Sequence, residues 1–124
     1  MWALRYVGQS YAEANCAQFA VQIQREVFDR QVVLPADLPA GLRGQSRLIN
    51  EKIEDFAERV ESPIEGDAVL MVCRGTLSHV GVFCLINYQA HVVHAMRGAG
   101  QVTLHRVAEL PRHGLKVEGY YRWR

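Results

Sequence analysis

Apolar residues between positions 14 and 30 recur at steps of three and four, which is the period of one helix face. Asn15 stands just before this stripe and is a residue type that often caps helix N-termini. The pattern therefore predicts an amphipathic helix that begins near residue 16. Its apolar positions are Cys16, Ala20, Ile23 and Val27, with Phe19 beside them.

A second helical pattern follows an irregular connection. Residues 33–44 carry two prolines and two glycines, which is typical of a loop. From Ser46 onward, apolar residues again follow the helical period, with charged residues on the opposite face. Ser62 and Pro63 end the pattern, so a second helix is predicted before them. Its apolar face holds Ile49, Ile53, Phe56, Ala57 and Val60.

The second half of the chain has the pattern of strands. Short apolar or alternating runs are separated by turn residues at residues 68–73, 79–86, 91–96, 101–106 and 117–123. Two helices followed by four or five short strands joined by tight turns predict an α+β domain with an antiparallel sheet of about five strands. The length of 124 residues and the absence of repeats predict one domain over 1–124.

Composition excludes several classes of protein. The chain has 14 basic and 13 acidic residues, and no long like-charge run, so we expect neither nucleic acid nor an anionic membrane as partner. Every apolar run is shorter than the ~20 residues of a spanning helix, so no membrane span is expected. The first nine residues lack the pattern of a secretion signal, which predicts a cytoplasmic location as encoded.

The three cysteines are widely spaced and form no C-x-x-C pair, which argues against a zinc knuckle or a redox motif. The five histidines likewise supply no clear ligand pair on one face. We therefore expect neither a metal nor another cofactor. Cys73 and Cys84 lie within apolar strand patterns and are interpreted as packing residues.

Cys16 stands where chemistry is feasible. The N-terminus of a helix offers unpaired N–H groups and the positive end of the helix dipole, and both stabilise a thiolate. The same N–H groups can receive an oxyanion during acyl transfer. The alternative interpretation is that Cys16 is the first core residue of the helix.

His79, at the start of a predicted strand, supplies the second half of a cysteine–histidine pair. Such a base needs a third polar group that fixes its tautomer. His91 and His94 on the next strand are the candidates, and their odd spacing puts them on opposite faces. The residues alone leave both open, and they assign no role to His105 or His113.

Five short stretches covering nearly the whole chain form an ordered set. They are Tyr11 with Asn15-Cys16-Ala17-Gln18-Phe19, then Gly66-Asp67-Ala68-Val69-Leu70, Ser78-His79-Val80-Gly81-Val82, Val93-His94-Ala95 and Gly119-Tyr120-Tyr121-Arg122-Trp123. Their order and setting resemble the NlpC family of cell-wall peptidases, which are papain-like cysteine hydrolases. The resemblance implies that Cys16 is the nucleophile and His79 the base, and it selects His94 as the third catalytic residue.

The resemblance also implies a substrate and partners. It predicts a peptidase or amidase that cleaves peptide stems of bacterial peptidoglycan, at the bond after a γ-linked D-Glu. Tyr11 matches a tyrosine that contacts substrate, and Asn15 and Ser78 flank the catalytic residues on the substrate side. The compact size and the closing Gly-Tyr-Tyr-Arg are most similar to members found with phage tail and prophage genes, which adds tail proteins as partners and a tail or export assembly as the route to the cell wall.

The residues around Cys16 differ from the family. The family commonly has Asp before the cysteine and glycine two residues after it, where this chain has Asn15 and Gln18. Two alternatives therefore stand beside the leading prediction. One is a related thiol acyltransferase, deamidase or toxin-like hydrolase that acts on another amide or thioester. The other is a non-catalytic binding domain of a tail assembly.

Overall fold

The fold is an α+β arrangement with one antiparallel sheet, and this part of the prediction is confirmed. The computed structural model describes residues 1–32, 55, 57–73 and 76–124, with 76–78 described in their backbone only. Within these residues the sheet has six strands, against the predicted number of about five, in the order β1-β6-β2-β3-β4-β5. The elements are η1 (Trp2–Arg5), α1 (Cys16–Val27), β1 (Ala57–Val60), β2 (Ala68–Cys73), β3 (Thr76–Ile86), β4 (Gln89–Met96), β5 (Gln101–Arg106), η2 (Val107–His113) and β6 (Leu115–Trp123).

Helix α1 begins at Cys16, as predicted. The Asn15 side chain accepts a hydrogen bond from the backbone N–H of Gln18, and the Gln18 side chain accepts one from the N–H of Asn15. This reciprocal capping box satisfies donors that the first turn of a helix leaves unpaired. Phe19 and Ile23, fully buried on the inner face, hold the helix against the sheet.

The second predicted helix lies mostly outside the described residues. Asp55 is helical, as predicted, but from residue 57 onward the prediction is wrong. Residues 57–60 form strand β1, which pairs with β6 from Ala57 opposite Trp123 to Val60 opposite Tyr120. Ala57 is fully buried, whereas the next two residues are exposed. Pairing with the chain's last strand therefore overrides the local helical pattern at this sheet edge.

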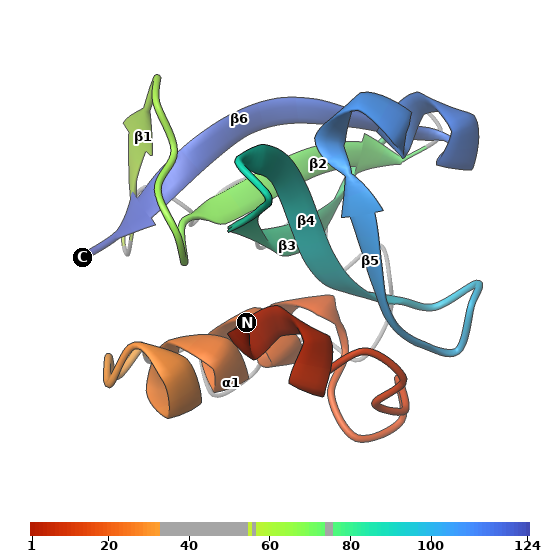
Figure 1. The fold of residues 1–124 in the computed structure, drawn as a ribbon, viewed down its shortest axis with the longest axis horizontal. Coiled ribbons are helices and arrows are strands. Elements are labelled where there is room, and N and C mark those ends of the chain that lie inside the picture. Colours follow the sequence, from red (N-terminus) through yellow and green to blue (C-terminus); the bar gives the residue numbers. More distant parts are fainter. Residues whose placement is uncertain (33–54, 56, 74–75) are drawn as a thin grey trace.

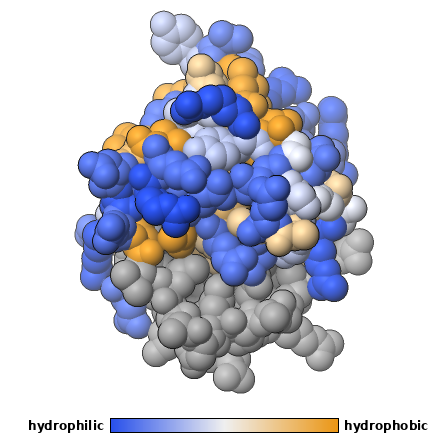
Figure 2. Space-filling view, turned by 90° about the horizontal axis from the view of Figure 1, so that it is seen from below, coloured by the Kyte–Doolittle hydropathy of each residue, from blue (hydrophilic) through white to orange (hydrophobic). Residues whose placement is uncertain are grey.

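Two layers of core lie on the two faces of the sheet. Helix α1 and the N-terminal turn η1 cover one face, and η2 covers the other (Figure 1). On the α1 face, Val80 and Val82 of β3 pack in the core with Phe19. On the η2 face, Phe83 and Leu110 share a second core with four other residues, which are Val69, Met71, Val92 and Leu115. Seen from the α1 side, the surface is mostly hydrophilic, as expected for the outer face of an amphipathic helix (Figure 2).

The hairpin of β3 and β4 sets the register of the site. Its turn is made by Asn87 and Tyr88, whose φ angles of 52° and 64° are those of a two-residue turn that matches strand twist. The paired stretch runs from Ile86 opposite Gln89 to Val82 opposite Val93. Beyond that point, β4 continues to pair with β5 as far as Met96 opposite Gln101.

The stretch at residues 66–70 contacts the closing stretch at residues 119–123. Asp67, 1% exposed, accepts hydrogen bonds from Arg122 of β6 and from the backbone N–H of Ile64. The indole N–H of Trp123 donates to the carbonyl of Gly66. The end of the chain is thus attached to the start of β2, which fixes the strand that borders β3.

Candidate active site

Cys16 lies in the first turn of α1 and is 1% exposed. The backbone N–H groups of Val80, of Ala17 and of Cys16 itself lie against its sulfur. These three donors lower the pKa of the thiol, but burial is the larger effect and raises it above its usual value. The helix N-terminus therefore does not by itself make a thiolate at neutral pH, and the resting residue is a thiol.

The Val80 donor is available because β3 and β4 part beside it. The N–H of Phe83 points toward β2, where it donates to Asp67. Because backbone groups alternate sides along a strand, the N–H of Val80 points toward β4 instead. Pairing with β4 has already ended at Val82, so this N–H is free to lie beside the Cys16 sulfur. The sulfur is thus next to the backbone of the residue that follows His79.

His79 and His94 form a hydrogen-bonded pair on the η2 face of the sheet. The distance from His79 Nε2 to His94 Nδ1 is 2.7 Å. Burial lowers the pKa of His79 to about 4, so its ring is neutral at pH 7. Because Nε2 of His79 is hydrogen-bonded to His94, only Nδ1 of His79 is left to accept a proton from another group.

Gly81 makes room for this pair. A Cβ at this position would stand 3.0 Å from Cβ of His94 and 3.1 Å from the Met71 side chain, and would clash with Val92. Because the position has no side chain, His94 can lie across β3 and reach His79.

The structure separates the two candidates for the third residue. His94 is fully buried beside His79, whereas His91 lies opposite Cys84 in the hairpin, with its Nδ1 2.8 Å from the Gln89 carbonyl. Residues opposite one another in a strand pair share a face, and Cys84 packs in the α1-side core. His91 therefore lies on the face away from the His79–His94 pair.

The histidine cluster is larger than the sequence indicated. His94 Nε2 lies 2.9 Å from Nδ1 of His105, and the ring of His105 lies over that of His113 with centroids 4.0 Å apart. Burial first, and the neighbouring histidine charges second, lower the pKa of His94. Both added histidines had been given no role. The glycine-rich turn at residues 97–100 was the sequence signal that could have indicated a role for His105. A hairpin centred on this turn places residue 105 diagonally beside residue 94, on the same face of the sheet.

The predicted substrate-side residues have different surroundings. Tyr11 is held near the site by its N–H, which donates to the Gly100 carbonyl at 2.9 Å. Burial first and the Cys16 charge second raise the pKa of Tyr11, and Arg97 lowers it. The Asn15 side chain is occupied by the helix cap. Ser78 lies in β3, and its side chain is outside the described part of the chain.

The described residues contain no group of three or more His, Cys, Asp or Glu side chains that could hold a metal ion. In the histidine cluster, the ring nitrogens face one another in pairs instead of converging on a point. Within the same described ranges, no helix has the length and apolar character needed to cross a membrane. Comparisons of the chain with protein-family models, with curated proteins and with solved structures yield no match.

Proposed function

We propose that the chain is a cysteine peptidase or amidase of the papain-like type that cleaves peptide stems of bacterial peptidoglycan. One observation carries the proposal. The sulfur at the N-terminus of α1 lies beside the backbone N–H of Val80, the residue directly after a buried histidine that is itself hydrogen-bonded to His94. A nucleophile, a base and an orienting group from three separated segments are the set that thiol-dependent acyl transfer requires.

In the proposed reaction, Cys16 attacks the amide carbonyl while His79 Nδ1 takes the thiol proton. His79 then gives that proton to the leaving amine, and water releases the acyl group from the sulfur. Because burial keeps the thiol and the imidazole neutral at rest, proton transfer accompanies attack and does not precede it. The N–H groups of the first turn of α1 lie beside the sulfur, where an oxyanion would form.

The test is digestion of purified sacculi, with released fragments identified by mass spectrometry. We expect cleavage after γ-linked D-Glu, and a loss on the order of 10⁴-fold or more in rate for Cys16→Ala, as for other nucleophile-base units. Cys73→Ala, which removes a half-buried thiol in β2, is the matched control and should retain activity. Equal fragment release by Cys16→Ala and the unsubstituted chain would contradict the mechanism.

The burial of Cys16 supports a second candidate, a domain that binds stem peptides without cleaving them. A sulfur that is 1% exposed needs some rearrangement before a carbonyl carbon can reach it. In that case the unsubstituted chain releases no fragments, and Cys16→Ala binds sacculi as tightly in a pull-down assay. Detection of an acyl adduct on Cys16 by intact-mass measurement would exclude this candidate.

A further inference from the structure

Three histidines of the sheet, His79, His94 and His105, form a continuous line that begins at the proposed base and ends near solvent. His79 contacts His94 at 2.7 Å, and His94 contacts His105 at 2.9 Å, each time from Nε2 of one ring to Nδ1 of the next. Each ring thus uses a different nitrogen for each neighbour. His113 covers the last ring, and it is the exposed member of the cluster.

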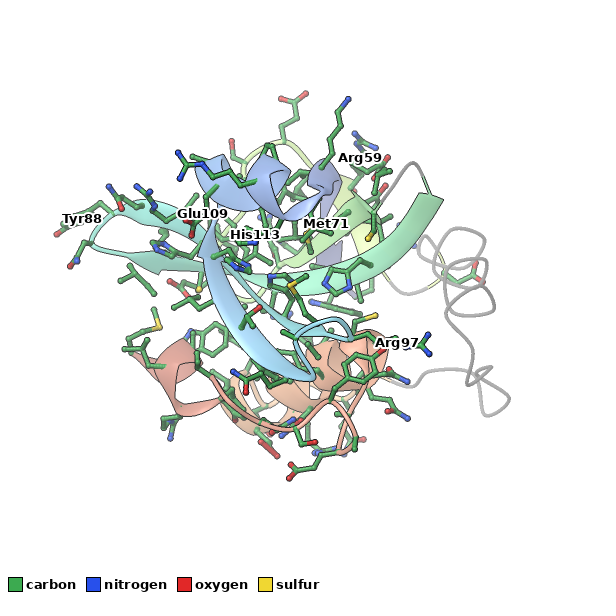
Figure 3. The ribbon with its side chains drawn as sticks, turned by 90° about the vertical axis from the view of Figure 1, so that its right-hand side faces the viewer. Arg59, Met71, Tyr88, Arg97, Glu109 and His113 are labelled. Carbon is green, nitrogen blue, oxygen red and sulfur yellow. The ribbon has the colours of Figure 1, made fainter. Side chains whose placement is uncertain are left out.

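Exposure is lowest at the centre of this line and highest at its His105 end. His94, at its centre, is fully buried and His79 is 8% exposed. His105 is half-buried and lies beside η2, the element that carries Glu109 and His113 (Figure 3). A proton on the inner rings would have to remain in an apolar environment, whereas a proton on His105 has solvent and a carboxylate nearby.

The atoms in contact allow only two neutral arrangements of protons. If His79 is to accept a proton at Nδ1, its own proton is on Nε2 and is donated to His94 Nδ1. His94 then carries its proton on Nε2 and donates it to His105 Nδ1, so His105 also carries its proton on Nε2. In the reverse arrangement every ring carries its proton on Nδ1, and His79 cannot act as a base.

We propose that His94 and His105 are a proton relay that connects the Cys16–His79 pair with solvent beside η2, with His105 as its positioning residue at the solvent end. The inference rests on the proposed role of His79 as the base. When Cys16 ionises, its proton passes to Nδ1 of His79, the Nε2 proton of His79 passes to His94 Nδ1, and the Nε2 proton of His94 passes to His105 Nδ1. His105 releases its Nε2 proton to water.

The net result is a thiolate, three neutral rings and one proton in solvent. The alternative is an imidazolium on His79, which burial opposes. When His79 later protonates the leaving amine from Nδ1, protons move back along the same line and His105 takes one from water. The two halves of a turnover thus reset each other, and no ring has to rotate.

Other charged groups also act on this line. The charges of Cys16 and Arg97 act on Tyr11. At the outer end of the line, His113 lowers the pKa of His105 and Glu109 raises it, while Arg106 acts on Glu109. In the contacts described, none of these groups lies between His79 and His105. A tautomer change in both His79 and His94 therefore indicates proton transfer along the histidine line.

The test is nuclear magnetic resonance of the full chain with ¹⁵N-labelled histidine and ¹³Cβ-labelled cysteine, titrated upward from pH 7. At pH 7 we expect His79 and His94 to be neutral with the proton on Nε2. As the Cys16 Cβ signal reports ionisation, both rings should change to the Nδ1–H form without becoming cations. Rings that keep their tautomers while Cys16 ionises, or that carry Nδ1–H already at pH 7, would overturn the relay.

A variant adds a second measurement. His105→Leu removes the outer acceptor, so the thiolate loses the stabilising Nδ1–H of His79, and the Cys16 midpoint should rise by about one pH unit, equivalent to tenfold less thiolate. His91→Gln, on the other face of β4, should leave the midpoint unchanged. An unchanged Cys16 midpoint in folded His105→Leu would contradict the proposal. If this variant does not fold, the tautomer measurement on the unsubstituted chain tests the relay by itself.

These spectra require no substrate, so the two proposals fail separately. Tautomer reversal in a chain that leaves sacculi intact would refute the proposed function and retain the relay. Cleavage of sacculi by a chain with fixed tautomers would do the opposite.

Discussion

The buried His79 ring makes the folded chain sensitive to mild acid. In the unfolded chain a histidine takes up a proton with a pKa of ~6.5, whereas burial lowers the pKa of folded His79 to about 4. Below pH 6.5 the unfolded state therefore binds more protons than the folded state. Stability should be fully present above pH 7 and should fall as the pH drops from about 6.5 toward 4.

The size of the loss follows from these two pKa values. At pH 5, proton binding to this histidine stabilises the unfolded chain about 30-fold more than the folded chain, in which its pKa is about 4. The free energy of unfolding is therefore lower by about 2 kcal/mol. The same calculation at pH 7 gives only about 0.2 kcal/mol. His94, whose pKa is also lowered by burial, adds to the loss in the same direction. For a domain of this size, 2 kcal/mol is a large part of an expected 5–15 kcal/mol.

The assay is urea unfolding at a series of pH values from 7.5 to 5, with tryptophan fluorescence as the readout. Glu26 and Glu109 have lowered pKa values and lose their stabilising charge below about pH 4.5, so the series stops above that range. His79→Gln should reduce the stability loss between pH 7 and 5 by about 2 kcal/mol, whatever its stability at pH 7. His91→Gln is the control for the removal of one histidine and should keep the original pH response.

The reasoning is refuted if the unsubstituted chain is equally stable at pH 7 and 5. It is also refuted if His79→Gln loses as much stability over this interval as the unsubstituted chain. Either result would mean that the His79 ring takes up its proton without unfolding.

Three further substitutions, and a fourth that serves as a control, test the fold around the site by the midpoint of urea unfolding. Gly81→Ala should cost about 1–3 kcal/mol of stability, because a Cβ there meets buried side chains. Gly98→Ala is the control and should change stability little, because a Cβ there meets nothing within 4 Å. Equal effects of the two substitutions would contradict the close packing of β3. Asn15→Ala should cost about 1 kcal/mol through loss of the α1 cap, and an unchanged midpoint would mean that the capping box does not stabilise the helix. Phe19→Ala should cost about 3–5 kcal/mol because the ring is fully buried, and a smaller loss would indicate that the core around α1 repacks.

Much of the fold could be predicted from local patterns. The cap and stripe of α1, and five of the six strands, lie where periodicity and turn residues indicated. Strand β1 could not be found in this way, because its four residues continue a helical pattern and its conformation is set by β6, more than fifty residues away. Its pairing depends on a partner that local sequence does not reveal.

The site was predictable to a different extent. Cys16 and His79 were selected from residue type and position, and the choice of His94 over His91 came from resemblance alone. The structure supplies a physical reason for that choice in strand register and in the missing side chain of Gly81. The raised pKa of Cys16 could not be predicted, because the position of a residue on a helix does not reveal how deeply the sheet buries it. His105 was overlooked because its relation to His94 depends on the register of a second hairpin.

The two-residue turn at the tip of the β3–β4 hairpin, where Tyr88 is labelled in Figure 3, determines which residues of β4 lie opposite the residues of β3. Inserting or deleting one residue there would shift β4 by one position, and side chains on a strand change face at every step. His94 would then lie on the α1 face and lose His79, even with Cys16, His79 and His94 all still present. A graft of this site onto another scaffold would therefore have to carry the whole hairpin, turn included, as one piece.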